Sequence, residues 1–190
     1  QVKLSIGPSI GDQGVAHHTF YSVAPEAVSF VNSKLERHPA AGINSNRNSP
    51  DRLVLNGPAD WAGVADTYFA MVIVPGKKTE GLEYRTVSYE HKLNGGTGEK
   101  RYLVTAFVPV QSDGSPNILY SGPKDHDLLT NASSIVSGLV QRPIDLEGLI
   151  DYGFLGWLSR PLAVPILRAI TYLFKVTGSY GVAIILFTIV

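Results

Sequence analysis

The chain contains no cysteine among its 190 residues. Disulfide frameworks, cysteine-ligated zinc and thiol catalysis are therefore excluded. Its 16 lysines and arginines balance 16 aspartates and glutamates, so no excess of positive charge favours nucleic acid as a partner. The uninterrupted apolar run at its C-terminus is shorter than the roughly 20 residues that a transmembrane helix takes.

Motifs that would carry catalysis are also sparse. Gly96–Lys100 has the composition of a phosphate-binding loop without its G-x-x-x-x-G-K-[ST] spacing, so a hairpin turn is the better interpretation. His17, His18 and His126 have no further ligands at the spacing of a metal site, and surface histidines are predicted instead. No serine lies in a nucleophile elbow. We expect a protein that is not an enzyme and has no cofactor or metal.

Patterns typical of antiparallel strands fill the middle of the chain. Leu82–Lys92 and Arg101–Val110 flank the glycines of Asn94–Gly98, which supply the positive φ angles that a hairpin needs. Tyr68–Val74 is apolar at odd and even positions alike, which predicts a strand covered on both faces, as inside a sandwich. The sequence therefore predicts a mainly β fold, an antiparallel β-sandwich over residues 1–150, followed by helices.

The remaining segments of this domain are assigned from local signals. Two short strands are expected within Gln1–Val23, the second at His18–Val23, and Pro25–Lys34 is expected to form a helical turn or two. Pro39–Asp51 is rich in Asn, Ser, Gly and Pro and is expected to be a long mobile loop. Gly122 is expected to cap a short helix that has Pro123 at its first position. Trp61 is interpreted as a core aromatic, with stacking on a sugar as the alternative.

The last forty residues differ from the rest. Trp157–Val176 is apolar apart from a stripe in which Arg160, Arg168 and Lys175 fall within about a quarter turn of one another at 100° per residue. A helix with so wide an apolar face and cations on the remainder suits a membrane surface, where the cations meet lipid phosphates. The candidate membrane-interface residues are Trp157, Arg160, Arg168 and Lys175.

A polar break at Thr177–Gly181 separates this helix from the run Val182–Val190, in which Thr188 is the one polar residue. The run ends without glycine, charge or a polar tail. We expect the natural chain to continue and Tyr180–Val190 to be the start of a transmembrane helix. A C-terminal helix buried in a core is the alternative.

Three ordered stretches resemble the YidC-type membrane protein insertases. Asp151-Tyr152-Gly153, the helix with Arg160-Pro161-Leu162 and the run from Tyr180-Gly181 to Leu186 resemble the entry into that family's membrane core. Upstream, Trp61-Ala62-Gly63-Val64 through Tyr68-Phe69-Ala70 to Val74-Pro75 resembles one of its strands, and Tyr120-Ser121-Gly122-Pro123 resembles its aromatic-x-G-P turn. Gln1–Asn56 matches weakly.

This resemblance implies both a function and a place. Residues 1–150 would be part of the periplasmic sandwich, residues 154–177 the amphipathic interfacial helix and residues 180–190 a truncated transmembrane helix, in a protein of the bacterial inner membrane. Such proteins insert nascent membrane proteins and help them fold, alone or with the Sec translocon, so nascent membrane proteins, the Sec translocon and membrane lipids are the expected partners. The family's groove cation would follow Val190.

Two other functions remain open from the residues. A carbohydrate-binding or carbohydrate-processing sandwich would use Trp61, and the resemblance extends to it because the family's periplasmic domain is similar in fold to sugar mutarotases. The second is a docking module tethered by one membrane helix. A cluster of lysines and arginines following Val190 would indicate such a tether, whereas further transmembrane helices would indicate an insertase.

Overall fold

The computed structural model describes residues 2–8, 25–92, 98–110, 113–151 and 156–189. The chain divides into two compact units, residues 1–150 and residues 151–190. Each unit is described on its own below. The first holds all the strands among the described residues, and the second consists of two helices.

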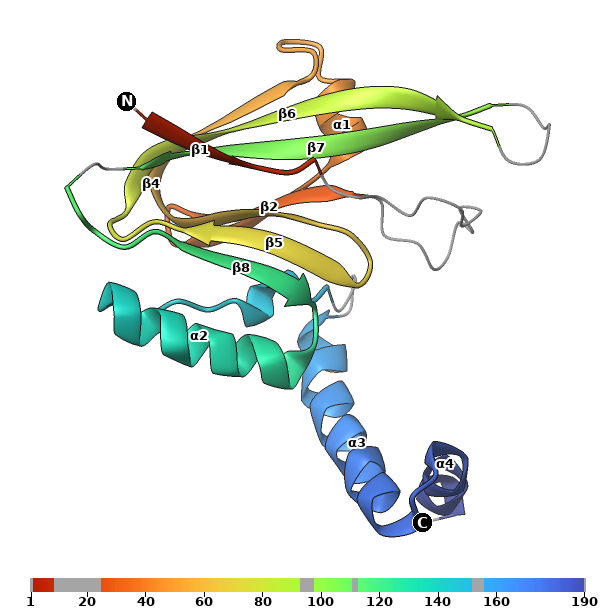
Figure 1. Cartoon of the computed structure of the whole chain (residues 1–190). Coiled ribbons are helices and arrows are strands. Elements are labelled where there is room, and N and C mark those ends of the chain that lie inside the picture. The colour runs from red at the N-terminus through yellow and green to blue at the C-terminus, as the bar shows by residue number, and fades with distance from the viewer. Residues whose placement is uncertain (1, 9–24, 93–97, 111–112, 152–155, 190) are drawn as a thin grey trace. The chain divides into compact units, whose positions relative to one another are not determined.

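The first unit is an antiparallel sandwich whose upper layer in Figure 1 contains β1, β7 and β6. The hairpin predicted around Asn94–Gly98 is confirmed: β6 (Thr79–His91) pairs with β7 (Glu99–Val110) from Glu83 opposite Phe107 to His91 opposite Glu99. The turn itself lies outside the described residues. β1 (Val2–Ile6) adds to the other edge of β7.

The other layer contains β3 (Lys34–Pro39), β2 (Glu26–Val31), β5 (Phe69–Val74) and β8 (Ile118–Pro123). All of its pairings are antiparallel. β4 (Arg52–Ala65) belongs to both layers, because Arg52–Ala59 pairs with β6 and Ala62–Ala65 pairs with β5. The register of β4 shifts against β6 between Leu55 and Pro58 and against β2 between Ala59 and Trp61, and such bulges are typical where one strand changes sheets.

Two apolar cores lie on opposite faces of the second layer. Successive side chains of a strand alternate between faces, so Ala62 and Val64 join the core between the sheets, whereas Trp61 and Ala65 join the core under α2 (His126–Val140). In β5, Ile73 likewise joins the core between the sheets, whereas Val72 and Val74 join the core under α2. The prediction of a strand covered on both faces is therefore confirmed. Trp61 is 1% exposed and is the core aromatic that the sequence predicted.

Pro39–Asp51 is not the long loop that was predicted. Its first part is α1 (Ala40–Asn44), in which Ala40 and Ile43 are buried in the core between the sheets. The Ala40 N–H donates to the Pro25 carbonyl at 2.8 Å. Two apolar side chains were enough to order this helix because the surrounding strands provide the rest of the core, which local composition does not report.

Two other local predictions are wrong. Pro25–Lys34 forms no helical turn but holds β2, because its side chains fill both cores and its backbone pairs with β3 and β4. Gly122 and Pro123 remain in β8 opposite Ala70 and Phe69, and the N-cap of α2 is Asp125, whose carboxylate accepts from the Leu128 N–H at 3.0 Å. The short 3₁₀ helix η1 (Glu147–Leu149) follows. The predicted strand at His18–Val23 lies outside the described residues.

The second unit holds α3 (Gly156–Thr177) and α4 (Tyr180–Ile189). The helix predicted over Trp157–Val176 is confirmed. Gly178 ends it with a φ of 70° and donates its N–H to the Phe174 carbonyl at 2.7 Å, an arrangement typical of helix C-termini. α4 begins at Tyr180, two residues before the predicted apolar run.

Candidate membrane interface

The two helices of the second unit contain basic residues and no acidic ones, although the unit itself begins with Asp151. No aspartate or glutamate occurs after Asp151 in the sequence. Arg168 and Lys175 are exposed on α3, and neither pairs with another described residue. At 100° per residue these two cations are about 20° apart around the helix, so the structure keeps them on one stripe. The stripe is free to meet anions from outside the chain.

The polar break between the helices folds α4 back against α3. The rings of Phe174 and Tyr180 stack with centroids 3.9 Å apart and an interplanar angle of 8°. Thr177 Oγ1 donates to the Leu173 carbonyl at 2.8 Å, and the Ala183 N–H donates to the Ser179 carbonyl at 3.0 Å. The turn is therefore ordered by local hydrogen bonds and one aromatic stack.

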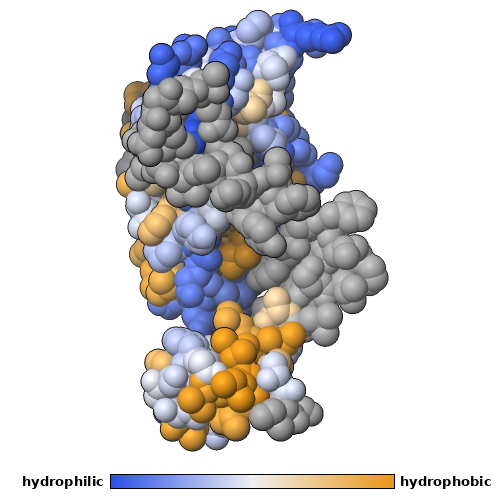
Figure 2. All heavy atoms as spheres, turned by 90° about the vertical axis from the view of Figure 1, so that its right-hand side faces the viewer, coloured by the Kyte–Doolittle hydropathy of each residue, from blue (hydrophilic) through white to orange (hydrophobic). Residues whose placement is uncertain are grey.

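This contact buries little of the apolar surface. Among the described side chains of α3 and α4, only that of Ala183 is buried. Tyr172 and Val176 are 68% and 70% exposed, and Ile185 is 59% exposed. Figure 2 shows hydrophobic residues gathered over α3 and α4. The other exposed members of this apolar surface are Ile166, Leu167, Tyr180, Val182, Ile184 and Leu186.

An exposed apolar surface of this extent indicates a contact site, since contiguous exposed apolar patches mark protein or membrane contacts. Among the described residues, no helix combines enough length with enough apolarity to cross a membrane. Of the four predicted interface residues, Arg168 and Lys175 are exposed, as an interface requires. Trp157 and Arg160 belong to α3, but their side chains lie outside those that the structure describes.

A different kind of candidate site, a pocket, lies in the first unit beside Trp61. It is a pocket of about 390 Å³ whose polar residues are Ser33, Asp60, Lys78, Arg142 and Asp145. The Lys78 Nζ contacts Asp60 Oδ2 at 2.9 Å, and the Arg142 Nε donates to Asp60 Oδ1 at 3.1 Å. The Arg142 Nη groups donate to the carbonyls of Gly76 (2.7 Å), Asp60 (3.0 Å) and Pro75 (2.7 Å).

These bonds give Arg142 a structural role. One guanidinium joins the segment after α2 to β4 and to the turn between β5 and β6, and it shares Asp60 with Lys78. Few of its N–H groups remain for a ligand, because a guanidinium has five. The indole of Trp61 presents no open ring face, being 1% exposed. Stacking on a sugar requires such a face, so the pocket does not favour the carbohydrate function.

The histidines that drew attention in the sequence form no cluster that the structure can show. His126 approaches Asp127 with Nδ1 at 3.3 Å and Glu147 with Nε2 at 3.7 Å. In the described parts of the chain, no group of three or more His, Asp or Glu residues is placed to hold a metal ion. His17 and His18 lie outside the described residues.

Comparison with known proteins identifies the family to which the chain belongs. A family model described as the YidC periplasmic domain matches residues 7–165. The chain is 32% identical over 143 residues to the membrane protein insertase YidC of Nitratidesulfovibrio vulgaris strain DP4, which covers 72% of this chain and 22% of that protein. It is 30% identical over 150 residues to the YidC of Chlorobium limicola, which covers 76% of this chain and 23% of that protein.

A third relative, the YidC of Pseudoalteromonas atlantica, is 31% identical over 134 residues, covering 70% of this chain and 21% of that protein. The chain is thus similar to the periplasmic domain class of membrane protein insertases, and its sandwich agrees with that class. It belongs to the YidC family. It spans less than a quarter of the length of each of these three relatives.

Proposed function

We propose that this chain is the C-terminal part of the large periplasmic domain of a membrane protein insertase of the bacterial inner membrane, together with the segment that enters the membrane. In this proposal α3 lies in the plane of the membrane surface, and α4 is the beginning of a transmembrane helix. The complete protein would insert nascent membrane proteins and help them fold, alone or beside the Sec translocon. No catalytic role is assigned.

The observation that carries the proposal is the apolar surface of α3 and α4, two helices without an acidic residue. Arg168 and Lys175, which pair with no other described residue, lie on one side of α3, and exposed aliphatic and aromatic side chains cover both helices. A membrane surface matches both features, since the apolar face enters the acyl boundary and lysine and arginine meet headgroup phosphates. A buried core would match neither, because buried cations need acidic partners and neither α3 nor α4 contains an acidic residue.

The direct test measures binding of the full chain to vesicles containing anionic lipid. Changing Arg160, Arg168 and Lys175 together to Glu should weaken binding at least about 100-fold, because each cation near such a surface contributes about 1 kcal/mol. Raising the salt concentration should weaken binding of the unchanged chain and have little effect on the triple variant.

The matched control changes three exposed cations of the first unit, Lys34, Arg47 and Lys92, to Glu. It alters net charge by the same amount, so its vesicle binding should stay near that of the unchanged chain. Equal loss in both variants would show that net charge, and not α3, governs binding. Unchanged vesicle binding in both variants would contradict the proposal that α3 lies on the membrane surface.

The functional division of the chain is tested in the complete protein. Deleting most of residues 1–132 should reduce insertion of a small single-spanning protein modestly, because a water-soluble sandwich provides no path for apolar helices through hydrocarbon. Replacing residues 154–177 with a flexible Gly/Ser linker should reduce insertion severely. The measurement is membrane integration in depleted cells at matched expression, and greater damage from the sandwich deletion would contradict the proposal.

A further inference from the structure

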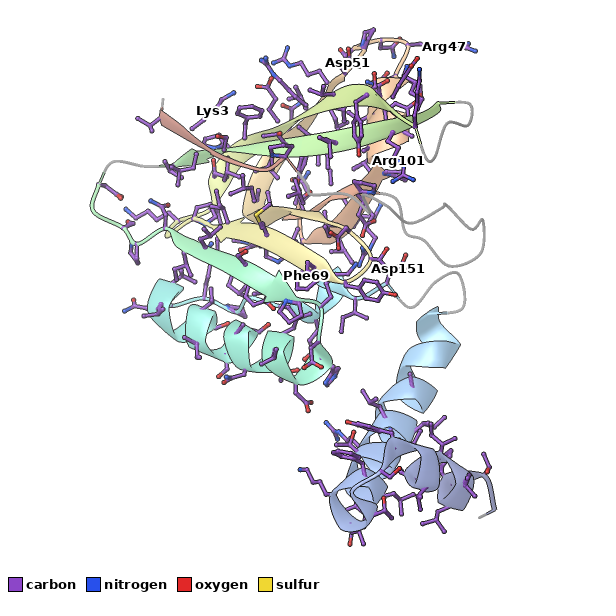
Figure 3. The ribbon with its side chains drawn as sticks, turned by 45° about the vertical axis from the view of Figure 1, so that its right-hand side comes forward. Lys3, Arg47, Asp51, Phe69, Arg101 and Asp151 are labelled. Atoms are coloured by element: carbon purple, nitrogen blue, oxygen red, sulfur yellow. The ribbon has the colours of Figure 1, made fainter. Side chains whose placement is uncertain are left out.

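The outer face of the upper sheet carries a group of charged residues that the membrane proposal does not use. Leu82 and Tyr84 of β6 point into the core between the sheets, so the intervening Glu83 and its neighbour Arg85 point outward. Arg52 of β4 is paired with Arg85, and Lys3 of β1 lies on β7 opposite Pro109. Figure 3 shows Lys3 on β1 at the outer side of this layer.

Glu83 is the centre of this group. It is 6% exposed, and its two carboxylate oxygens accept from three cations. The Lys3 Nζ contacts Oε2 at 2.9 Å, while the Nε groups of Arg52 and Arg85 contact Oε1 at 2.9 and 2.8 Å. Hydrogen bonds from Lys3 and Arg85, with a further contribution from Arg52, lower the pKa of Glu83 to about 2. The group has three positive charges and one negative charge.

Each of the two arginines is fixed to Glu83 through its Nε, while its terminal N–H groups remain available. Both donate from Nε to the same carboxylate oxygen, and the two residues are cross-strand neighbours because Arg52 is directly opposite Arg85. Within the described residues, Nη1 and Nη2 of both arginines form no hydrogen bond to protein. The side chains are 51% and 60% exposed. Arg85 also lies over the ring of Phe107, with its Cζ 5.6 Å from the centroid.

Apolar side chains surround these donors on the same face. Val54 is directly opposite Glu83 on β4, and Val87 follows Arg85 on β6. They are among the large apolar residues left exposed. Asp51, the residue before β4, accepts a hydrogen bond from the Asn44 side chain of α1 through its carboxylate. The surface therefore combines oriented guanidinium donors, an aromatic ring and open aliphatic groups.

We propose that this face, formed by Lys3, Arg52, Val54, Arg85, Val87 and Phe107, is a docking surface for a protein segment that carries carboxylates beside apolar side chains. The charge of the group is the main argument, since a carboxylate pairs bidentately with guanidinium N–H groups. The exposed valines favour a protein segment over a small oxoanion, which would leave them in water. Arginine and aromatic residues are also enriched where binding energy concentrates in protein interfaces. This surface belongs to the first unit, and its proposed role does not depend on the membrane proposal.

The test uses the full chain in mild detergent and a short fluorescein-labelled peptide of repeated Glu-Leu-Gly units, followed by fluorescence anisotropy. The peptide should bind, and its Gln-Leu-Gly counterpart should bind at least about tenfold more weakly. The variant R52Q/R85Q should lose the preference for glutamate, whereas R47Q/K92Q, with the same charge change elsewhere, should retain it. R52K/R85K keeps both charges without the planar fork and should show an intermediate preference.

Thermal unfolding of each variant shows whether loss of binding reflects loss of fold, and the lysine variant preserves partners for Glu83 if the glutamine variant is unstable. Equal binding of the two peptides, or unchanged binding by R52Q/R85Q, would overturn the proposal. So would absence of binding by the unchanged chain, which would leave the group as an ion-pair network that only stabilises the sheet. Displacement of the peptide by inorganic phosphate, or selective loss of anionic-vesicle binding by R52Q/R85Q, would assign the face to phosphate or lipid headgroups instead.

Discussion

The two units of this chain use apolar residues in opposite ways. In the first unit, Trp61, Val64 and Val72 are almost completely buried, and the charged groups near them are paired. In the second unit, Tyr172, Val176 and Ile185 are mostly exposed, and Arg168 and Lys175 of α3 pair with no residue that the structure describes. The first unit buries its apolar side chains in its own cores, whereas the second leaves apolar side chains exposed that suit contact with something outside the chain.

The largest expected effect is in the core under α2. Trp61→Ala should lower the free energy of unfolding by about 3–5 kcal/mol, because the indole is fully buried and its removal leaves a cavity. Urea unfolding of the full chain in mild detergent measures this. Tyr68→Ala, at a side chain that is 69% exposed, is the control and should change stability by less than about 0.5 kcal/mol. Similar losses in both variants would show that burial does not separate these positions.

The next effect concerns the guanidinium that joins three segments. Arg142→Ala should cost about 2–4 kcal/mol, because it leaves three carbonyls and one Asp60 oxygen without this donor. Arg142→Lys should recover part of the loss by restoring charge near Asp60. Arg47→Ala, at an exposed arginine, should be almost neutral in the same unfolding assay. A neutral Arg142→Ala would mean that the pocket residues are not held by this network.

A smaller, pH-dependent effect is expected at Glu83. Its pKa is lowered from 4.5 to about 2 in the folded state, so its stabilising effect is present above pH 4.5 and is lost as pH falls toward 2. The cations are about half exposed, and solvent screening limits the effect to about 1–2 kcal/mol. Stability measured from pH 6 to pH 2 should fall less steeply in Glu83→Gln. If stability falls equally with pH in the unchanged chain and in Glu83→Gln, the protonation of Glu83 does not contribute to the pH dependence of stability.

The smallest effect on folding should come from the exposed residues of the second unit. Changing Leu167 and Val176 to Ser should alter the unfolding free energy of the first unit by less than about 0.5 kcal/mol. The same change should weaken vesicle binding about tenfold or more, since it removes apolar groups from the surface proposed to enter the lipid. Destabilisation of the first unit would show that these side chains contribute to its core, and the contrast between the units would fail.

Local patterns in the sequence were sufficient for several elements. Alternation and glycine turns predicted the β6–β7 hairpin, and the apolar run before Pro75 predicted a strand covered on both faces. The stripe through Arg168 and Lys175 predicted α3. These features depend on residues that are close in the chain, where strand and helix periodicity are directly visible. The same patterns could not place β2 or α1, whose conformations depend on strands far along the chain.

The charged networks were also beyond local analysis. Glu83 lies between Leu82 and Tyr84 in a strand that also contains Glu80 and Glu90, so nothing in the local sequence indicates which of these acids is buried or what would pair with it. Its partners Lys3 and Arg52 are 80 and 31 residues away, and Arg142 reaches Asp60 across 82 residues. Only the folded sheets bring these groups within hydrogen-bond distance.

The sequence alone determined the division between a mainly β domain and an apolar, acid-free helical end, because composition and periodicity are properties of neighbouring residues. The tertiary structure decided which face of each strand was covered, that Trp61 is buried in a core, and that Arg52 and Arg85 both contact one buried carboxylate. Strand register and the crossing of β4 between the layers set those distances, and both result from pairing between segments that are remote in the chain.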